Sequence, residues 1–179
     1  MLSVIIATYD SDRPLVATLA ALVPGATAGL VREVIVADGR SYDETEQVAD
    51  YAGCVFFASG EPLAWRLNTA ASRARGEWLL FLRPGAVPAA TWVDESIAFA
   101  RRGHAQAAVF SEEAGRFPAW IRRAFALPGP QQGLLIPKPF YAELGGHRMG
   151  PSDPESDLLR RIGRPRLTVL RTTVSRSNI

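Results

Sequence analysis

The fold of this chain is decided by two short runs of sequence, SVIIATYD (Ser3–Asp10) and EVIVADGRS (Glu33–Ser41). Each run is mostly apolar and β-branched, and each ends in polar turn residues. Such a run is typical of a strand that is buried on both faces. Between the two runs, Leu15, Leu19 and Leu22 have helical spacing. The two runs therefore predict a strand–helix–strand unit.

The same alternation continues along the chain. Pro24-Gly25 is expected to end the first helix, and the spacing of Ser41 and Glu44 predicts a capping box for the second. Further strands are predicted at 54–58, 78–82, 106–110, 133–136 and 167–170, and further helices at 63–74, 91–102, 117–127, 140–144 and 155–162. Strands that alternate with helices require right-handed crossovers, which favours an α/β fold with a mostly parallel sheet flanked by helices. No repeat or linker interrupts the pattern, so we expect a single domain over residues 1–179.

Composition limits the classes of protein that this chain can be. Its 47% hydrophobic and 21% charged residues are typical of a globular protein and exclude a disordered tail. The single cysteine, Cys54, excludes an internal disulfide and a cysteine-based zinc cluster, and the two histidines are too few for a histidine-rich metal site. No apolar run reaches the ~20 residues that span a bilayer, and the apolar N-terminal stretch has no basic segment before it. We therefore expect a cytoplasmic protein.

The formal net charge is +2, and we expect no nucleic-acid partner. The excess of basic residues gathers late in the sequence, where it indicates either an anionic partner or a solvated face. The residues concerned are Arg160, Arg161, Arg164, Arg166, Arg171 and Arg176. Nothing in the sequence indicates an oligomeric state.

Ligands of parallel α/β sheets bind at the carboxyl ends of the strands. The candidate site is therefore the set of segments that end the predicted strands: Thr8-Tyr9-Asp10, Asp38-Gly39-Arg40-Ser41 and Arg83-Pro84-Gly85. An aspartate at such an edge is well placed for a ligand. The alternatives are that Asp38-Gly39 is a plain turn and that Asp10 only precedes a helix.

Taken together, these segments resemble the family 2 glycosyltransferases. In that family the first strand ends in PTYN and the second in VDGS, which resemble ATYD and ADGRS here. Further similar motifs follow in the same order: LN at 67–68, ARGEWLLFL at 74–82, QGLLI at 132–136, LGGH at 144–147 and ESDL at 155–158. The resemblance covers residues 2 to about 175. It implies a Rossmann-like, three-layer GT-A fold, with a nucleotide-binding half of about 1–88 and an acceptor half of about 89–179.

The resemblance also implies an activity, the inverting transfer of a sugar from a nucleotide-diphosphate donor to an unknown acceptor. In the family, the corresponding strand ends hold the nucleoside. Carried over, Thr8, Tyr9 and Asp10 would line the base and ribose. Asp38, followed by Gly39, would accept a hydrogen bond from the base.

The resemblance also implies roles for three residues of the second half. Glu155 would be the general base that takes the proton of the acceptor hydroxyl as its oxygen attacks the anomeric carbon. A spacing of three from Ser152 offers the alternative that Glu155 only caps a helix. His147 and Trp120 would lie near the acceptor. Trp120 belongs to an apolar and basic segment that is either a packed lid helix or a peripheral contact with the inner face of the membrane.

The sequence departs from the family at the metal site. The family carries Asp-x-Asp at the end of the fourth strand and binds Mg²⁺ or Mn²⁺ there, whereas this chain has Arg83-Pro84-Gly85. With both aspartates missing, we assign no metal ligand and no cofactor. Either Arg83 faces the diphosphate and replaces the cation, or the domain binds a nucleotide or glycan without catalysis, or Arg83 is a plain surface residue. Nucleotidyl transfer is disfavoured, since the loop after Thr8 has neither glycine nor lysine.

Overall fold

The structure is a computed structural model that describes residues 1–103, 105–112 and 129–177. The described residues form one eight-stranded sheet in the order β3-β2-β1-β4-β7-β6-β8-β5. The strands are β1 (Leu2–Thr8), β2 (Val31–Asp38), β3 (Val55–Ala58), β4 (Trp78–Leu82), β5 (Ala86–Pro88), β6 (Ala107–Glu112), β7 (Leu134–Pro137) and β8 (Leu167–Arg176). The helices are α1 (Asp12–Thr27), α2 (Thr45–Tyr51), α3 (Leu63–Arg73), α4 (Trp92–Ala100), α6 (Lys138–Glu143) and α7 (Pro154–Ile162), with short 3-10 turns at Pro130–Gln132 and Arg164–Arg166.

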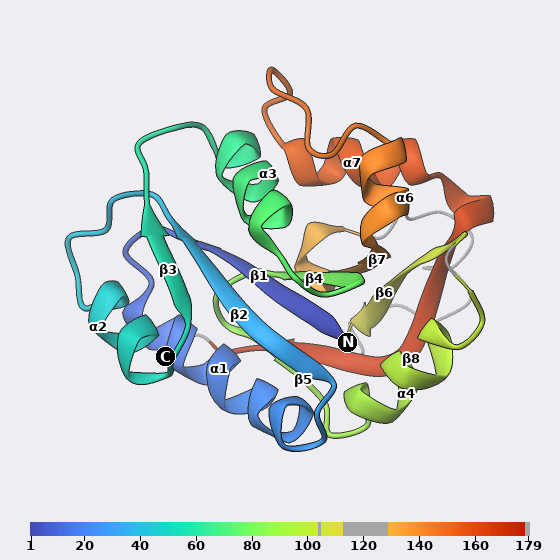
Figure 1. The fold of residues 1–179 in the computed structure, drawn as a ribbon, viewed down its shortest axis with the longest axis horizontal. Helices are drawn as coiled ribbons and strands as arrows, with labels where there is room; N and C mark the ends of the chain where they lie inside the picture. Colours follow the sequence, from blue (N-terminus) through green and yellow to red (C-terminus); the bar gives the residue numbers. More distant parts are fainter. Residues whose placement is uncertain (104, 113–128, 178–179) are drawn as a thin grey trace.

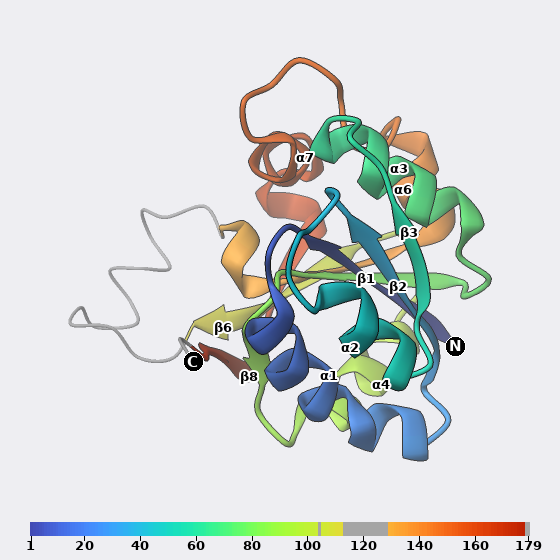
Figure 2. The ribbon, with the colours of Figure 1, turned by 90° about the vertical axis from the view of Figure 1, so that its left-hand side faces the viewer.

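The sheet is mixed, with its parallel part at the N-terminal side. Strands β3, β2, β1 and β4 are parallel, whereas β7 is antiparallel to both β4 and β6. Helices α1, α2 and α4 cover one face, and α3, α6 and α7 cover the other (Figures 1 and 2). In the register of the parallel strands Thr8 lies opposite Asp38, and Ile6 lies opposite Leu82. The predicted α/β fold is confirmed, and the carboxyl ends of these strands meet at one edge.

Each face of the sheet has its own apolar core. Val4, Ile6 and Leu80 pack in one cluster with residues of α1 and α4. Ile5 and Leu79 point the other way and pack in a second cluster with residues of α3, α6 and α7. Both sets of strand residues are fully buried, as expected where successive side chains alternate across a strand that is covered on both faces.

The expectation that Pro24-Gly25 ends the first helix is wrong, because α1 continues to Thr27. The reason lies in tertiary packing. A Cβ atom on Gly25 would lie 2.4 Å from the ring of Trp92, and the Nε1 of Trp92 donates to the carbonyl of Ala21 at 3.1 Å. This contact holds the last turn of α1 against α4 although Pro24 lacks a backbone donor.

Two further expectations concern the second half. The last strand was expected at 167–170 but extends to Arg176, and its end pairs with the short strand β5, which the sequence did not predict. The predicted helix at 117–127, with Trp120, lies outside the described residues. Among the residues that are described, none of the helices is long and apolar enough to cross a membrane.

Candidate active site

A cavity of about 410 Å³ lies at the carboxyl ends of β1 and β4. Leu63 and Leu67 of α3 contribute apolar wall. Three charged side chains also line it: Arg83 directly after β4, Glu155 in the first turn of α7 and Arg176 at the end of β8. A wider groove of about 540 Å³ between α1, β2 and α2 has no charged lining residue. The charged side chains that could bind or react with a ligand therefore line the smaller of these two cavities.

Arg83 and Glu155 form an ion pair in this cavity. The Nε of Arg83 donates to Glu155 Oε2 at 2.8 Å, and its Nη2 donates to the same oxygen. The two side chains are 31% and 14% exposed, respectively. Burial raises the pKa of Glu155, and the hydrogen bonds and charge of Arg83 offset part of that rise. The sequence singled out both residues, and the structure brings them into contact.

The start of α7 leaves the carboxylate of Glu155 free for this contact. The cap is Asp153, whose Oδ1 accepts from the backbone N–H groups of Glu155 and Ser156 at 3.2 and 3.1 Å. The alternative that Glu155 forms a capping box with Ser152 is therefore wrong. Asp153 occupies the position just before the first helical residue, where aspartate is one of the preferred capping residues.

Asp38 organises the tips of β1 and β2. Its Oδ1 accepts from the hydroxyl of Thr8 at 2.7 Å, and its Oδ2 accepts from the backbone N–H of Ser41 at 2.7 Å. Asp38 is 1% exposed. Ser41 also donates through its hydroxyl to Asp38, so the predicted capping box with Glu44 does not form. The predicted hydrogen bond from a base to Asp38 stays a prediction.

The loop after β1 is tied to the loop after β2. The N–H of Asp10 donates to Ser41 Oγ at 2.9 Å, and Asp10 Oδ1 accepts from the N–H of Tyr42 at 2.8 Å. Asp10 has a φ of 44°, a left-handed conformation that is unusual without glycine. Gly39 fits against Tyr9, since a Cβ there would lie 3.1 Å from its ring. The residues predicted at the ends of β1 and β2 thus form one connected cluster, in which Tyr9 is 58% exposed, whereas Arg83 lines the neighbouring cavity.

The structure places two further arginines here: Arg66, which sequence reasoning missed, and Arg176, which it named only as one of the late basic residues. Arg66 of α3 donates through Nη1 to the carbonyls of Ala37 and Thr8 at 2.7 and 3.1 Å, so it links the ends of β1 and β2. Burial lowers the pKa of Arg66, while the charge of Asp38 opposes this. Arg176 lines the cavity. Neither arginine stands in a local motif, and only the fold reveals them.

His147 lies behind the cavity rather than in it. It is 2% exposed, its Nδ1 lies 2.7 Å from the hydroxyl of Tyr141, and its backbone N–H donates to Asn68 Oδ1 at 2.9 Å. Burial lowers the pKa of His147 to about 3, so the ring is neutral. His147 does not line the cavity but shares a small recess with Glu155, which lines both. This packing gives no support to the predicted contact of His147 with an acceptor.

The residues present do not suit a divalent cation. In the described part of the chain, no group of three or more His, Cys, Asp or Glu side chains is placed to hold a metal ion. At the turn where the family's motif would supply carboxylates, the guanidinium of Arg83 lies against Glu155. A guanidinium is always charged and cannot ligate a metal.

Several solved structures share this fold, each less than 20% identical to this chain. A mannosyltransferase from Pyrobaculum calidifontis, in complex with GDP-Man and Mn²⁺, is 19% identical with a TM-score of 0.78 over 95% of this chain and 54% of its own. Glucosyl-3-phosphoglycerate synthase from Mycobacterium tuberculosis, in complex with Mn²⁺, UDP and phosphoglyceric acid, is 18% identical with a TM-score of 0.75 over 100% and 71%. Residues 1–349 of S. aureus TarS are 17% identical with a TM-score of 0.74 over 96% and 59%, so this chain spans about three fifths of that structure.

Sequence comparison gives the family. A search of curated proteins finds no match. The family model described as "Glycosyl transferase family 2" matches residues 3–152, which include β1 to β7 and the turn at Arg83 and end just before α7. Because the match covers most of the chain and the fold agrees with it, the chain belongs to glycosyl transferase family 2.

Proposed function

We propose that this protein transfers a sugar from a nucleotide-diphosphate donor to the hydroxyl of an acceptor with inversion, and that it does so without a divalent metal. One observation carries the proposal. The Arg83–Glu155 pair lies in the cavity at the strand ends, where the family holds its donor. The nucleoside would lie against the cluster around Tyr9, Asp10 and Asp38.

The free atoms of the pair suit this reaction. No hydrogen bond joins Glu155 Oε1 or Arg83 Nη1 to any residue that the structure describes. Glu155 Oε1 takes the proton of the acceptor hydroxyl while the acceptor oxygen attacks the anomeric carbon. The bond from that carbon to the diphosphate breaks, and Arg83 Nη1 donates to the departing phosphate oxygen. The raised pKa of Glu155 makes it a stronger base than an exposed glutamate.

A second function is favoured by the missing metal ligands. A domain that binds a nucleotide or glycan without catalysis would keep the strand-end cluster and need no cation. It would also use Arg83 and Glu155 only as a structural ion pair. The two functions therefore differ in turnover and not in the fold.

Binding and turnover measured side by side test the proposal. UDP and GDP are titrated by calorimetry in EDTA and again in Mn²⁺, and hydrolysis or transfer of UDP- and GDP-sugars is followed in the same buffers. We expect binding and turnover in EDTA, with turnover lost in Glu155→Gln, which keeps hydrogen-bonding capacity toward Arg83. Arg83→Ala should weaken nucleotide binding and abolish turnover.

Arg171→Ala is the control, because Arg171 is an exposed arginine of β8 that does not line the cavity. Binding without turnover would favour the binding domain. Turnover that requires Mn²⁺ would contradict the metal-free reaction.

A further inference from the structure

The end of β8 is fixed against the turn that replaces the family's metal motif. Strand β5 pairs with β8 so that Ala86 lies opposite Arg176. The N–H of Ser177 donates to the carbonyl of Gly85 at 2.9 Å, and a Cβ on Gly85 would lie 2.9 Å from the carbonyl oxygen of Ser177. Gly85 also has a φ of +84°, which favours glycine. This close approach carries Arg176 to the cavity that holds Arg83.

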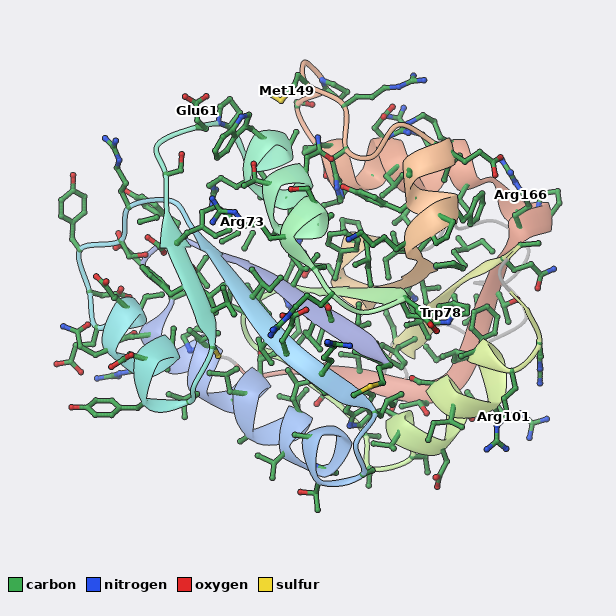
Figure 3. The ribbon with its side chains drawn as sticks, in the orientation of Figure 1. Glu61, Arg73, Trp78, Arg101, Met149 and Arg166 are labelled. Carbon is green, nitrogen blue, oxygen red and sulfur yellow. The ribbon has the colours of Figure 1, made fainter. Side chains whose placement is uncertain are left out.

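Of the six late arginines, Arg176 is the one that lines the cavity, although it is exposed to solvent. Arg161 pairs with Asp157 at 2.8 Å. Arg166, which Figure 3 shows at the right-hand edge of the molecule, pairs with Glu143 at 3.3 Å. The side chain of Arg176 forms neither an ion pair nor a hydrogen bond with any residue in the described ranges, and it lines the cavity. The sequence indicated an anionic partner or a solvated face for this group, and Arg176 is the member that faces a cavity.

The charges of the cavity leave one cation without a counter-charge. The only acidic side chain among the described residues that line it is Glu155, which is already bonded to Arg83. Arg83 has a second counter-charge outside the lining, because its Nη2 lies 3.9 Å from Asp153 Oδ1, whereas Arg176 has no acidic partner among the described residues. Arginine forks match the oxygens of phosphate groups, and they are the common solution where a planar, bidentate donor is needed.

We propose that Arg176 and Arg83 together form a diphosphate-binding pair that takes over the charge-neutralising part of the absent divalent cation. This inference rests on the proposed function, since the diphosphate would be that of the sugar donor. It assigns Arg176 as a binding residue, and it predicts nucleotide binding that is independent of metal and dependent on salt.

Inorganic pyrophosphate, UDP, GDP and UMP serve as probes in calorimetry with EDTA present. We expect Arg176→Ala to weaken the binding of pyrophosphate and of the diphosphate nucleotides about tenfold or more, as for the loss of a charge-assisted hydrogen bond. UMP, which lacks the second phosphate, should lose less. Arg176→Lys should recover part of the affinity, because it keeps the charge but loses the fork. Arg171→Ala on the same strand should bind like the wild type.

The outcomes separate this inference from the proposed function. Nucleotide binding that is unchanged in Arg176→Ala overturns the pair and leaves the donor proposal standing. Pyrophosphate binding that needs Arg176, without binding of any nucleotide, keeps the pair and overturns the donor. If neither pyrophosphate nor nucleotide binds to the folded wild type, both are wrong. Circular dichroism and thermal unfolding check that each variant is folded.

Discussion

Replacing Arg83 by methionine should destabilise the protein in a manner that depends on pH. The substitution keeps much of the aliphatic side chain but removes both hydrogen bonds to Glu155 and the positive charge. A hydrogen bond to a charged group contributes about 1.5–3 kcal/mol, and a buried charge without its partner costs several kcal/mol. Arg83 is 31% exposed, so water can replace part of the interaction. We therefore expect a loss of about 2 kcal/mol at pH 7.5, or roughly 4–8 °C in Tm for a domain of this size.

The sign of the pH dependence follows from Glu155. Its folded pKa is raised above the ordinary value of 4.5, mainly by burial, so the folded state holds the proton of Glu155 more tightly than the unfolded state does. The folded state therefore loses stability as the pH rises from 4.5 through the raised pKa. Arg83 lowers this pKa, so without Arg83 it rises further. The loss in Arg83→Met should therefore be largest at pH 7.5 and should shrink to less than about 1 kcal/mol near pH 4, where Glu155 is protonated in both proteins.

Urea unfolding followed by tryptophan fluorescence measures this difference at several pH values, with equal m-values as the check on two-state behaviour. Arg171→Met is the matched control, because it removes an exposed arginine outside the cavity. A loss that is the same at pH 4 and 7.5 would mean that the charge of Glu155 is not responsible. If Arg83→Met is as stable as the wild type at pH 7.5, the ion pair contributes nothing to folding.

Three further expectations concern residues away from this pair. Glu33 accepts from Ser3 Oγ at 2.6 Å, and although burial opposes its charge, its hydrogen bonds lower its pKa below 4.5. Its contribution is therefore present above pH 4.5 and lost as the pH falls through the lower folded value, so Glu33→Gln should unfold about 1–2 kcal/mol more easily at pH 7 and approach the wild type as the pH falls below that folded value. The ring of His147, with its pKa lowered to about 3 by burial, should show no titration by NMR between pH 5 and 8, and a midpoint near 6.5 would contradict its enclosure. A Cβ on Gly76 would lie 2.5 Å from the backbone nitrogen of Ser3, so Gly76→Ala should cost about 2 kcal/mol or more in urea unfolding. A Cβ on Gly53 is the comparison for steric contact alone, since it meets no atom of the described residues within 4 Å, although the φ of +69° there favours glycine.

The parallel half of the fold could be predicted because its information is local. Each of its strands is an apolar run bounded by turn residues, and the helices between them have clear spacing. Strand β5 could not be predicted, since its three residues have no periodicity and its strand state depends on pairing with β8, far away in sequence. The end of β8 was missed for the same reason.

The two predicted capping boxes do not form, because an aspartate side chain lies near each of them. Ser41 and Ser152 both had the right spacing, but a carboxylate competes better than a hydroxyl for backbone donors. Asp38 accepts from the backbone N–H of Ser41, and Asp153 accepts from two backbone N–H groups in the first turn of α7. Spacing alone does not show which of several polar side chains takes a donor, because that choice depends on where the preceding strand or loop ends.

The candidate site shows the same division between what is local and what is not. Arg83 was visible because the sequence departs there from the family's Asp-x-Asp motif, and Glu155 was visible through the resemblance of residues 155–158 to the family. The sequence does not show that the side chains of Arg83 and Glu155 contact each other. A guanidinium at the tip of a buried strand requires a counter-charge, and a largely buried carboxylate requires a donor, so the contact between Arg83 and Glu155 satisfies both. Because this contact uses only one edge of the guanidinium and one oxygen of the carboxylate, it leaves Arg83 Nη1 and Glu155 Oε1 without a hydrogen-bond partner among the described residues, and these are the two atoms that the proposed reaction requires.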